Sequence, residues 1–214
     1  MPAVERNEAA NAIIAAGRRL GARGLISAGE GNVSIRLDRD HLAITPSGRR
    51  KDELAAGDIV VLGPGLDEER GRAARSASGL APSSDIAIHL AAHAARPDIA
   101  AVAHAHLPAA MALTVAGEIP DPNALPETAL FLPRVPFLAY GEPGSQDLAR
   151  RIAAALTDPP EPFANVVLLE RHGAIAVGPT PDAAVDRLEL LEVLCRTWRD
   201  SLLLRAARAT VGPV

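Results

Sequence analysis

Short apolar runs alternate along this chain with longer stretches of helical periodicity, and this alternation restricts the fold more than any other feature. Residues 32–37 and 42–45 flank the turn sequence Asp-Arg-Asp-His and predict a β-hairpin. Further strand candidates are residues 59–62, 99–106, 135–138, 166–169 and 174–177, and the helix candidates are residues 4–22, 84–95, 108–115, 144–156 and 181–205. A hairpin followed by interleaved helices and strands predicts a single α/β domain over residues 1–214, with an α/β/α layered fold.

Two segments between these elements predict irregular structure. Residues 63–82 are rich in Gly, Ser and Arg and are expected to form a mobile loop. Residues 117–134 contain four prolines, which interrupt helices and strands. We therefore place both segments outside the regular elements.

The composition restricts the core and the partners. Aromatic residues make up 2% of the chain and apolar residues 48%, so the core must be built from Ala, Leu, Val and Ile. With few aromatic rings and a net charge of −4, no nucleic-acid partner is expected. No apolar run is long enough to predict a membrane span, and the first residues do not resemble a secretory signal. Cys195 is the only cysteine, which fits a reducing cytoplasm.

The chain contains one lysine, Lys51, among 22 basic Lys and Arg residues. Schiff-base catalysis needs a desolvated lysine with a lowered pKa. Lys51 stands in the charged sequence SGRRKDEL and is expected near the surface. Any carbon–carbon bond chemistry is therefore expected to depend on a metal.

His104 and His106 end an apolar run and are the first candidates for metal ligands. Residues two apart on a strand face the same side, so both imidazoles can bind one ion. His172 lies in a polar Glu-Arg-His-Gly tetrad between two strand candidates and is the natural third ligand. Three histidines with an open fourth position are typical of catalytic zinc, and Asp85 could fill or border that position. The alternative is a group of buried histidines with hydrogen-bond partners and no metal.

His89 and His93 lie one helical turn apart and could also chelate an ion, but we interpret them as ordinary helix residues. Asp85 precedes His89 by four residues and can pair with it on one helix face. His41, in the turn of the hairpin, is expected to be solvated.

Three clusters of small residues offer backbone N–H groups or hydroxyls that could hold a phosphate. They are Gly31-Asn32-Val33-Ser34, Thr45-Pro46-Ser47-Gly48 and Pro82-Ser83-Ser84. The third cluster also precedes a helix, and helix N-termini favour anions. Ordinary turns and helix caps use the same residue types. Arg49 and Arg50 could instead receive a carboxylate.

Several segments, read in order, resemble the class II aldolase/adducin family. They are GEGNVSIRL, ITPSG, PSSDIAIHLAAHAARPDIAAVAHAHLPAAMAL, VPFLAYGEPGS and NVVLLERHGAIAVGPTPDAAVDRLELLEVL. The segments are collinear and cover roughly residues 5–200.

The resemblance implies an α/β/α fold with a central, largely antiparallel sheet. It also implies a homotetramer whose active sites lie between neighbouring subunits. The implied metal ligands are His104, His106 and His172, with Zn2+ expected and Mn2+, Co2+ or Ni2+ as alternatives. The implied contacts of the substrate phosphate are Asn32, Ser47, Gly48, Ser83 and Ser84.

Asp85 falls where aldolases of this family usually carry a glutamate that acts as acid and base. The related ribulose-phosphate 4-epimerases carry an aspartate there, as a metal ligand. We expect Asp85 to be the catalytic acid/base, with the metal-ligand role as the alternative. Family members are also completed by a tyrosine, whereas Tyr140 is the only tyrosine here and is expected to be structural.

The resemblance favours a metal-dependent aldolase that cleaves a small ketose phosphate to dihydroxyacetone phosphate and an aldehyde, through a zinc-stabilised enediolate. The segment VPFLAYGEPGS is similar to aldolase-type members. The alternatives within the family are a pentulose-5-phosphate 4-epimerase and a sugar-acid-phosphate decarboxylase. A non-catalytic, metal-stabilised assembly module is the alternative from a different class.

Overall fold

A single β-sheet forms the centre of the chain, whose computed structural model describes residues 3–64 and 67–211. Its strands are β1 (Asn32–Arg36), β2 (Leu42–Ile44), β3 (Val60–Leu62), β4 (Ala101–Ala105), β5 (Phe137–Leu138), β6 (Val166–Leu169) and β7 (Gly173–Gly178). Within the described residues they form a 7-stranded sheet in the order β3-β2-β1-β4-β7-β6-β5. Only β5 and β6 pair in parallel, so the expected, largely antiparallel sheet is confirmed.

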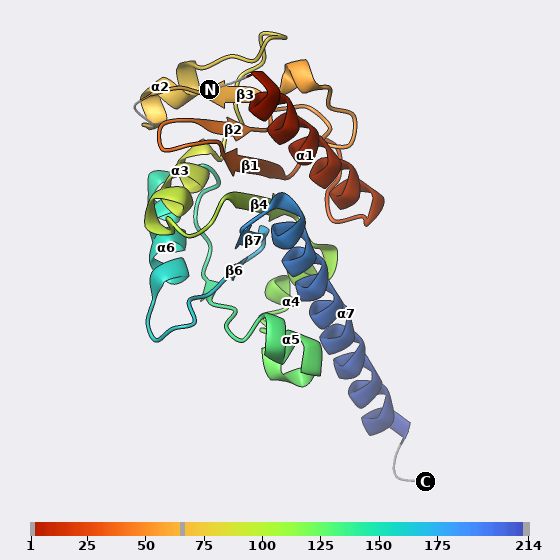
Figure 1. The fold of residues 1–214 in the computed structure, drawn as a ribbon. Coiled ribbons are helices and arrows are strands. Elements are labelled where there is room, and N and C mark those ends of the chain that lie inside the picture. Colours follow the sequence, from red (N-terminus) through yellow and green to blue (C-terminus); the bar gives the residue numbers. More distant parts are fainter. Residues whose placement is uncertain (1–2, 65–66, 212–214) are drawn as a thin grey trace.

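Helices cover both faces of the sheet, which gives the expected α/β/α layers (Figure 1). The α-helices are α1 (Ala3–Ala22), α2 (Glu68–Ala73), α3 (Ile86–Ala95), α4 (Pro108–Val115), α5 (Pro126–Phe131), α6 (Gln146–Thr157) and α7 (Pro181–Val211). Two short 3-10 helices are η1 (Ala56–Asp58) and η2 (Pro122–Ala124). The helices α3 and α6 pack together on one face, and α1, α4 and α7 pack on the other.

Alternation along β4 explains how one strand serves both layers. Val102 belongs to the core under α3 and α6, whereas Ala103 and Ala105 belong to the core under α1 and α7. Side chains two apart on a strand share a face. His104 therefore points to the same side as Val102, toward α3.

The two segments expected to be irregular each contain a helix, so those expectations were wrong. In residues 63–82, α2 forms with acidic residues in its first turn and an ion pair between Arg72 and Glu68, four residues apart. In residues 117–134, Pro122 and Pro126 occupy the first turns of η2 and α5. Proline suits that position because its fixed φ matches the helix and its missing N–H would be unpaired there.

The ends of several central strands lie close together on one side of the sheet. Asn32 begins β1 and pairs in register with His104 near the end of β4. The short β6–β7 turn and the start of α3 lie near these strand ends, because β7 pairs with β4 and α3 packs on that face. Among the described helices, none combines the length and apolar character needed to cross a bilayer.

Candidate metal centre and active-site cavity

Three histidine rings meet where β4 ends and the β6–β7 turn begins. The ring centroid of His104 lies 4.9 Å from that of His106 and 4.8 Å from that of His172. The centroids of His106 and His172 are 5.1 Å apart. One nitrogen from each ring lies within 4.8 Å of the other two. The structure thus brings together the three histidines that the sequence nominated, in a cluster small enough to share an ion.

The backbone of the β6–β7 turn places His172 against β4. Arg171 and Gly173 both have positive φ values, 56° and 113°. A Cβ atom on Gly173 would lie only 2.1 Å from the carbonyl oxygen of Ala105. Only glycine tolerates so close an approach of two backbones, so this position fixes how near His172 comes to His104.

Hydrogen bonds and unpaired nitrogens show that the cluster fits a metal ion. His104 donates from Nδ1 to the carbonyl oxygen of Ala174 over 3.0 Å, which leaves a lone pair on Nε2. That Nε2 and the Nδ1 of His172 are buried and have no hydrogen-bond partner among the described residues. A buried polar atom without a partner costs about 1–3 kcal/mol. A cation bound by the cluster would remove this cost.

Burial also sets the protonation state that a metal requires. It lowers the pKa of His104 to about 3, assisted by the neighbouring His172. The pKa of His172 is lowered as well, first by burial and then by His106. Neutral imidazole is the form that binds metals, so both rings are in the competent state near neutral pH.

Glu30 is a site residue that the sequence did not reveal. Its Oε1 lies 3.3 Å from Nδ1 of His106, in the position of a residue that orients a metal ligand from outside. The sequence contained one signal, since Glu30 stands between two glycines just before Asn32. A single carboxylate in a glycine-rich turn is, however, common at surfaces.

A cavity of about 250 Å³ adjoins the histidine cluster. His106 and His172 line it, together with Asp85 at the start of α3. The residues nominated for phosphate binding line it as well: Asn32, Ser47, Gly48, Ser83 and Ser84. Residues from five separate segments of the chain therefore converge on one space, and their roles there remain predictions.

Asp85 is buried, with 7% of its surface exposed, and it is held in place by neighbours. Its Oδ2 accepts a hydrogen bond of 2.7 Å from Nδ2 of Asn32. Burial alone would raise the pKa of the carboxyl group, but His104 and the hydrogen bond from Asn32 outweigh it and lower that pKa. Asp85 is therefore ionised at neutral pH.

Lys51 is buried, with 1% of its surface exposed, so its expected surface position was wrong. Its Nζ donates to the carbonyl oxygens of Gly29, over 2.7 Å, and Arg49, over 2.6 Å. Burial lowers the pKa of the ammonium to about 8, against the opposing charge of Asp85. The flanking charged residues face solvent while Lys51 turns inward, and a string of charged letters cannot reveal that difference. Lys51 joins two loops of the cavity and lines it.

Tyr140 lies outside the cavity, as far as the described residues define it. It is 47% exposed, and its hydroxyl donates to Glu142 over 3.1 Å. The guanidinium of Arg171 stacks on its ring, with 4.8 Å between Cζ and the ring centroid. The site of one chain therefore gains no phenol from Tyr140.

His89 and His93 are both buried, on the face of α3 that meets β1. The expected side-chain pairing of Asp85 with His89 is replaced by an indirect contact, because Asn32 bonds to both. The ordinary helix role assigned to these histidines is thus too simple. His41 does not stand free in solvent, since its Nδ1 lies 2.9 Å from Oδ1 of Asp38.

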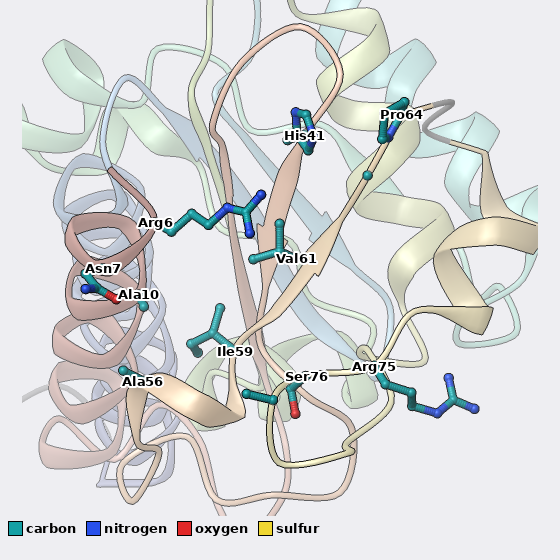
Figure 2. Close-up of a pocket in the computed structure, with 12 residues that line it drawn as sticks. Arg6, Asn7, Ala10, His41, Ala56, Ile59, Val61, Pro64, Arg75 and Ser76 are labelled. Carbon is teal, nitrogen blue, oxygen red and sulfur yellow. The ribbon is translucent and has the colours of Figure 1, made fainter. Parts of the chain in front are cut away.

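A second cavity, of about 530 Å³, lies on the other face of the sheet, between α1 and the edge strand β3. Figure 2 shows that Arg6 extends from α1 toward Val61, whereas the side chain of Arg75 points away from the cavity. His41, the histidine that lines this cavity, already contacts the carboxylate of Asp38. Although this cavity is larger, the described residues that line it include one histidine and no carboxylate, whereas the histidine site combines two histidines with Asp85 and Glu30. We therefore take the histidine site as the candidate active site.

The chain is similar to known proteins over most of its length. The methylthioribulose-1-phosphate dehydratase of Acidiphilium cryptum is 34% identical over 194 residues, which cover 86% of this chain and 87% of the relative. The 3-oxo-tetronate 4-phosphate decarboxylase of Haemophilus influenzae is 30% identical over 181 residues, or 82% of this chain and 80% of the relative.

A solved structure and a family model also match this chain over most of its length. The crystal structure of l-fuculose-1-phosphate aldolase from Thermus thermophilus matches with a TM-score of 0.77 and 26% identity, over 99% of both chains. The family model described as the class II aldolase and adducin N-terminal domain matches residues 11–199. The chain therefore belongs to the class II aldolase and adducin N-terminal domain family.

Proposed function

We propose that this chain is a metal-dependent lyase of a small sugar phosphate, and that it cleaves a ketose phosphate to dihydroxyacetone phosphate and an aldehyde. The observation that carries the proposal is the cavity beside the cluster of three histidines, which is also lined by an ionised Asp85 and by small-residue loops. The similarity of the chain to a fuculose-phosphate aldolase and to relatives named for phosphorylated substrates adds support.

The residues that would hold the metal are His104, His106 and His172. Three imidazole nitrogens favour zinc over manganese, with cobalt and nickel as close competitors. When bound there, the metal supplies Lewis-acid polarisation of a substrate oxygen. Glu30 keeps the His106 ring in one orientation, and the carbonyl oxygen of Ala174 does the same for His104.

Asp85 is the acid/base in this proposal. Aldol cleavage begins when a base removes the proton of the hydroxyl group next to the bond that breaks. An ionised carboxylate that lines the cavity can accept that proton and later return it to the carbon left behind. The hydrogen bond from Asn32 fixes the carboxylate so that it need not reorient during the reaction.

The phosphate is assigned to the small-residue loops that line the cavity. Ser47, Ser83 and Ser84 offer hydroxyl groups there, and Gly48 and Ser84 offer backbone N–H groups. Lys51 adds a positive charge beside them, which the sequence had not suggested. Binding energy from a group remote from the reacting bond orients the substrate without taking part in the chemistry.

Dehydration of a ketose phosphate is the second candidate. Aldolases of the family are completed by a tyrosine, and Tyr140 does not line the cavity of its own chain. Loss of water needs a base that removes a proton next to a carbonyl group and an acid that protonates the leaving hydroxyl. One carboxylate can perform both transfers in turn. The 34% identical relative is named as a dehydratase, which favours this candidate over epimerisation.

A single panel separates these reactions. Zinc-loaded protein is incubated with ketose 1-phosphates, pentulose 5-phosphates and phosphorylated sugar acids, and the products are identified by mass and, for epimers of equal mass, by chromatography. Aldol cleavage yields dihydroxyacetone phosphate, dehydration yields a product lighter by one water, and decarboxylation releases CO2. Dihydroxyacetone phosphate from any ketose 1-phosphate supports the first candidate. A folded, metal-loaded protein that converts no member of the panel contradicts the proposal.

A further inference from the structure

A buried chain of hydrogen bonds extends from Asp85 away from the cavity, between β1 and α3. Nδ2 of Asn32 contacts Oδ2 of Asp85 at 2.7 Å, and Oδ1 of Asn32 contacts Nε2 of His89 at 2.5 Å. Nδ1 of His89 contacts Oγ of Ser34 at 2.7 Å. The same Oγ contacts Nε2 of His93 at 2.9 Å. We call these four residues behind Asp85, namely Asn32, Ser34, His89 and His93, the buried chain.

Sequence and topology explain why the members meet. Asn32 and Ser34 are two residues apart on β1 and face α3, while Val33 between them faces the opposite core. His89 and His93 are four residues apart on α3 and face β1. The strand and helix residues therefore alternate along the chain of contacts, and each member is at most 4% exposed.

Donor and acceptor rules give this chain a single direction. An ionised carboxylate only accepts, so Asn32 donates to Asp85 through its amide nitrogen and presents its oxygen to His89. Nε2 of His89 must then carry hydrogen, which makes its Nδ1 an acceptor for the hydroxyl of Ser34. The Oγ of Ser34 in turn accepts from Nε2 of His93.

The far end and the protonation states agree with this direction. Nδ1 of His93 is left with a lone pair, and it faces a guanidinium nitrogen of Arg36 at 3.5 Å. Burial lowers the pKa of His89 to about 4 and that of His93 to about 3. Both rings are therefore neutral near pH 7, as a chain with one donor and one acceptor per ring requires.

The contacts exclude two other roles. Both nitrogens of His89 have hydrogen-bond partners, so His89 and His93 do not form a second metal site. The amide of Asn32 stands between His89 and Asp85, and a carboxamide does not accept and release protons as an imidazole does. The buried chain therefore holds Asp85 and does not conduct protons to it.

We propose that His89, Ser34 and His93 are positioning residues that act through Asn32 to fix the orientation of the Asp85 carboxylate for proton transfer. The inference rests on the acid/base role proposed for Asp85. Hydrogen bonds in such a row strengthen one another when all point the same way. Oδ2 of Asp85 is thus held by the protein, and Oδ1 is the oxygen left for the substrate.

Ser34→Ala tests the proposal, because it removes the hydroxyl with little change in side-chain volume. Ser34 also does not line the cavity, so the substitution removes no direct contact with the substrate. We expect kcat to fall about tenfold or more, because a mispositioned base loses part of its contribution. The KM of the phosphorylated substrate and the zinc content should stay within about twofold of the parent, a fold-change worth less than 1 kcal/mol. His89→Gln keeps one donor and one acceptor and should retain more activity than His89→Leu.

Ser76→Ala is the matched control, because Ser76 is equally a buried serine but lies in a remote loop. It should leave kcat unchanged. A Ser34→Ala protein with parental kcat, or a His89→Leu protein as active as His89→Gln, would overturn the proposal.

A measurement that needs no turnover separates this inference from the proposed function. Histidine-selective 15N NMR of the full chain has only six histidines to resolve. We expect His89 and His93 to be neutral with hydrogen on Nε2, opposite to His104, whose Nδ1 donates to Ala174. A charged ring of His89 or His93 at pH 7, or hydrogen on Nδ1 of His89, would disprove the hydrogen-bond direction of the buried chain even if the enzyme proves active.

Discussion

Individual residues in this protein owe their charge states to burial as much as to their partners. His89 and His93 are neutral because α3 and β1 exclude water from both rings. The unfolded chain has no such restriction, so it takes up protons near the ordinary histidine pKa of 6.5. Protonation therefore favours the unfolded state as the pH falls.

This difference predicts acid sensitivity well above the range where carboxylates titrate. The folded pKa of His89 is lowered to about 4, so its contribution is present above pH 6.5 and is lost progressively below it. Between pH 7.5 and pH 5 we expect the free energy of unfolding to fall by about 2 kcal/mol for this histidine alone. Urea unfolding at both pH values measures it. The His89→Gln variant should show a smaller drop, and equal drops would contradict the assignment.

Asp85 offers a second prediction at this scale, because its two candidate roles differ in one observable. Asp85→Asn keeps the size of the side chain but removes the base, so kcat should fall about 100-fold or more. If Asp85 acts as acid/base, the protein should still bind one zinc per chain with unchanged affinity. A loss of zinc measured by metal analysis would instead assign Asp85 as a metal ligand.

Residue spacing made part of the site predictable. His104 lies on β4 and His106 directly follows the last residue of that strand, and their spacing of two residues let the sequence alone predict that both rings face one side. Lys51 and Glu30 were not predictable, because inward rotation of one charged side chain depends on packing between loops that are far apart in sequence. The directed contacts of His89 were hidden for the same reason.

At the scale of elements, the β6–β7 turn, which carries His172, controls how closely this histidine approaches His104 on β4. Gly173→Ala would place Cβ 2.1 Å from the carbonyl oxygen of Ala105, on a residue whose φ is 113°. We expect a loss of stability of about 2 kcal/mol or more and weaker zinc binding, because the turn must move away from His104.

Gly63→Ala is the control for this change, since a Cβ there meets no atom within 4 Å and needs no positive φ. It should leave thermal unfolding and zinc content as they are in the parent protein. A Gly173→Ala protein with parental stability and metal content would show that the turn does not set the geometry of the cluster.

The helices and strands were largely predictable because apolar periodicity follows from which face is buried. The prolines of the segment 117–134 misled the prediction, since proline at the start of a helix favours the helix that it would break elsewhere. The turn geometry at Arg171 and Gly173 also escaped it, because positive φ values follow from the approach of β4.

At the scale of the molecule, the end formed by α5 and the last turns of α7 exposes large apolar side chains to solvent. Helix α5 packs against α7 there (Figure 1), and the exposed fractions are 60% for Phe131, 63% for Leu203 and 62% for Leu204. Homotetramer formation, which the family resemblance implies, would cover such residues.

Light scattering of the purified protein should therefore give four times the chain mass. The double variant Leu203→Glu/Leu204→Glu should give a smaller species, because charges at a subunit contact lose their hydration. As a control, Arg150→Glu at a solvent-facing position should leave the mass unchanged. A parent protein that is monomeric at micromolar concentration would contradict the assembly.

The central claim, that the histidine cluster holds a catalytic metal, is tested most directly by removing and restoring that metal. The protein is treated with a chelator, checked for folding by circular dichroism, and assayed with ketose 1-phosphates before and after zinc is added. We predict a folded apo-protein that releases no dihydroxyacetone phosphate and regains its activity with zinc. An apo-protein that unfolds, or one that keeps its activity without metal, would contradict the claim.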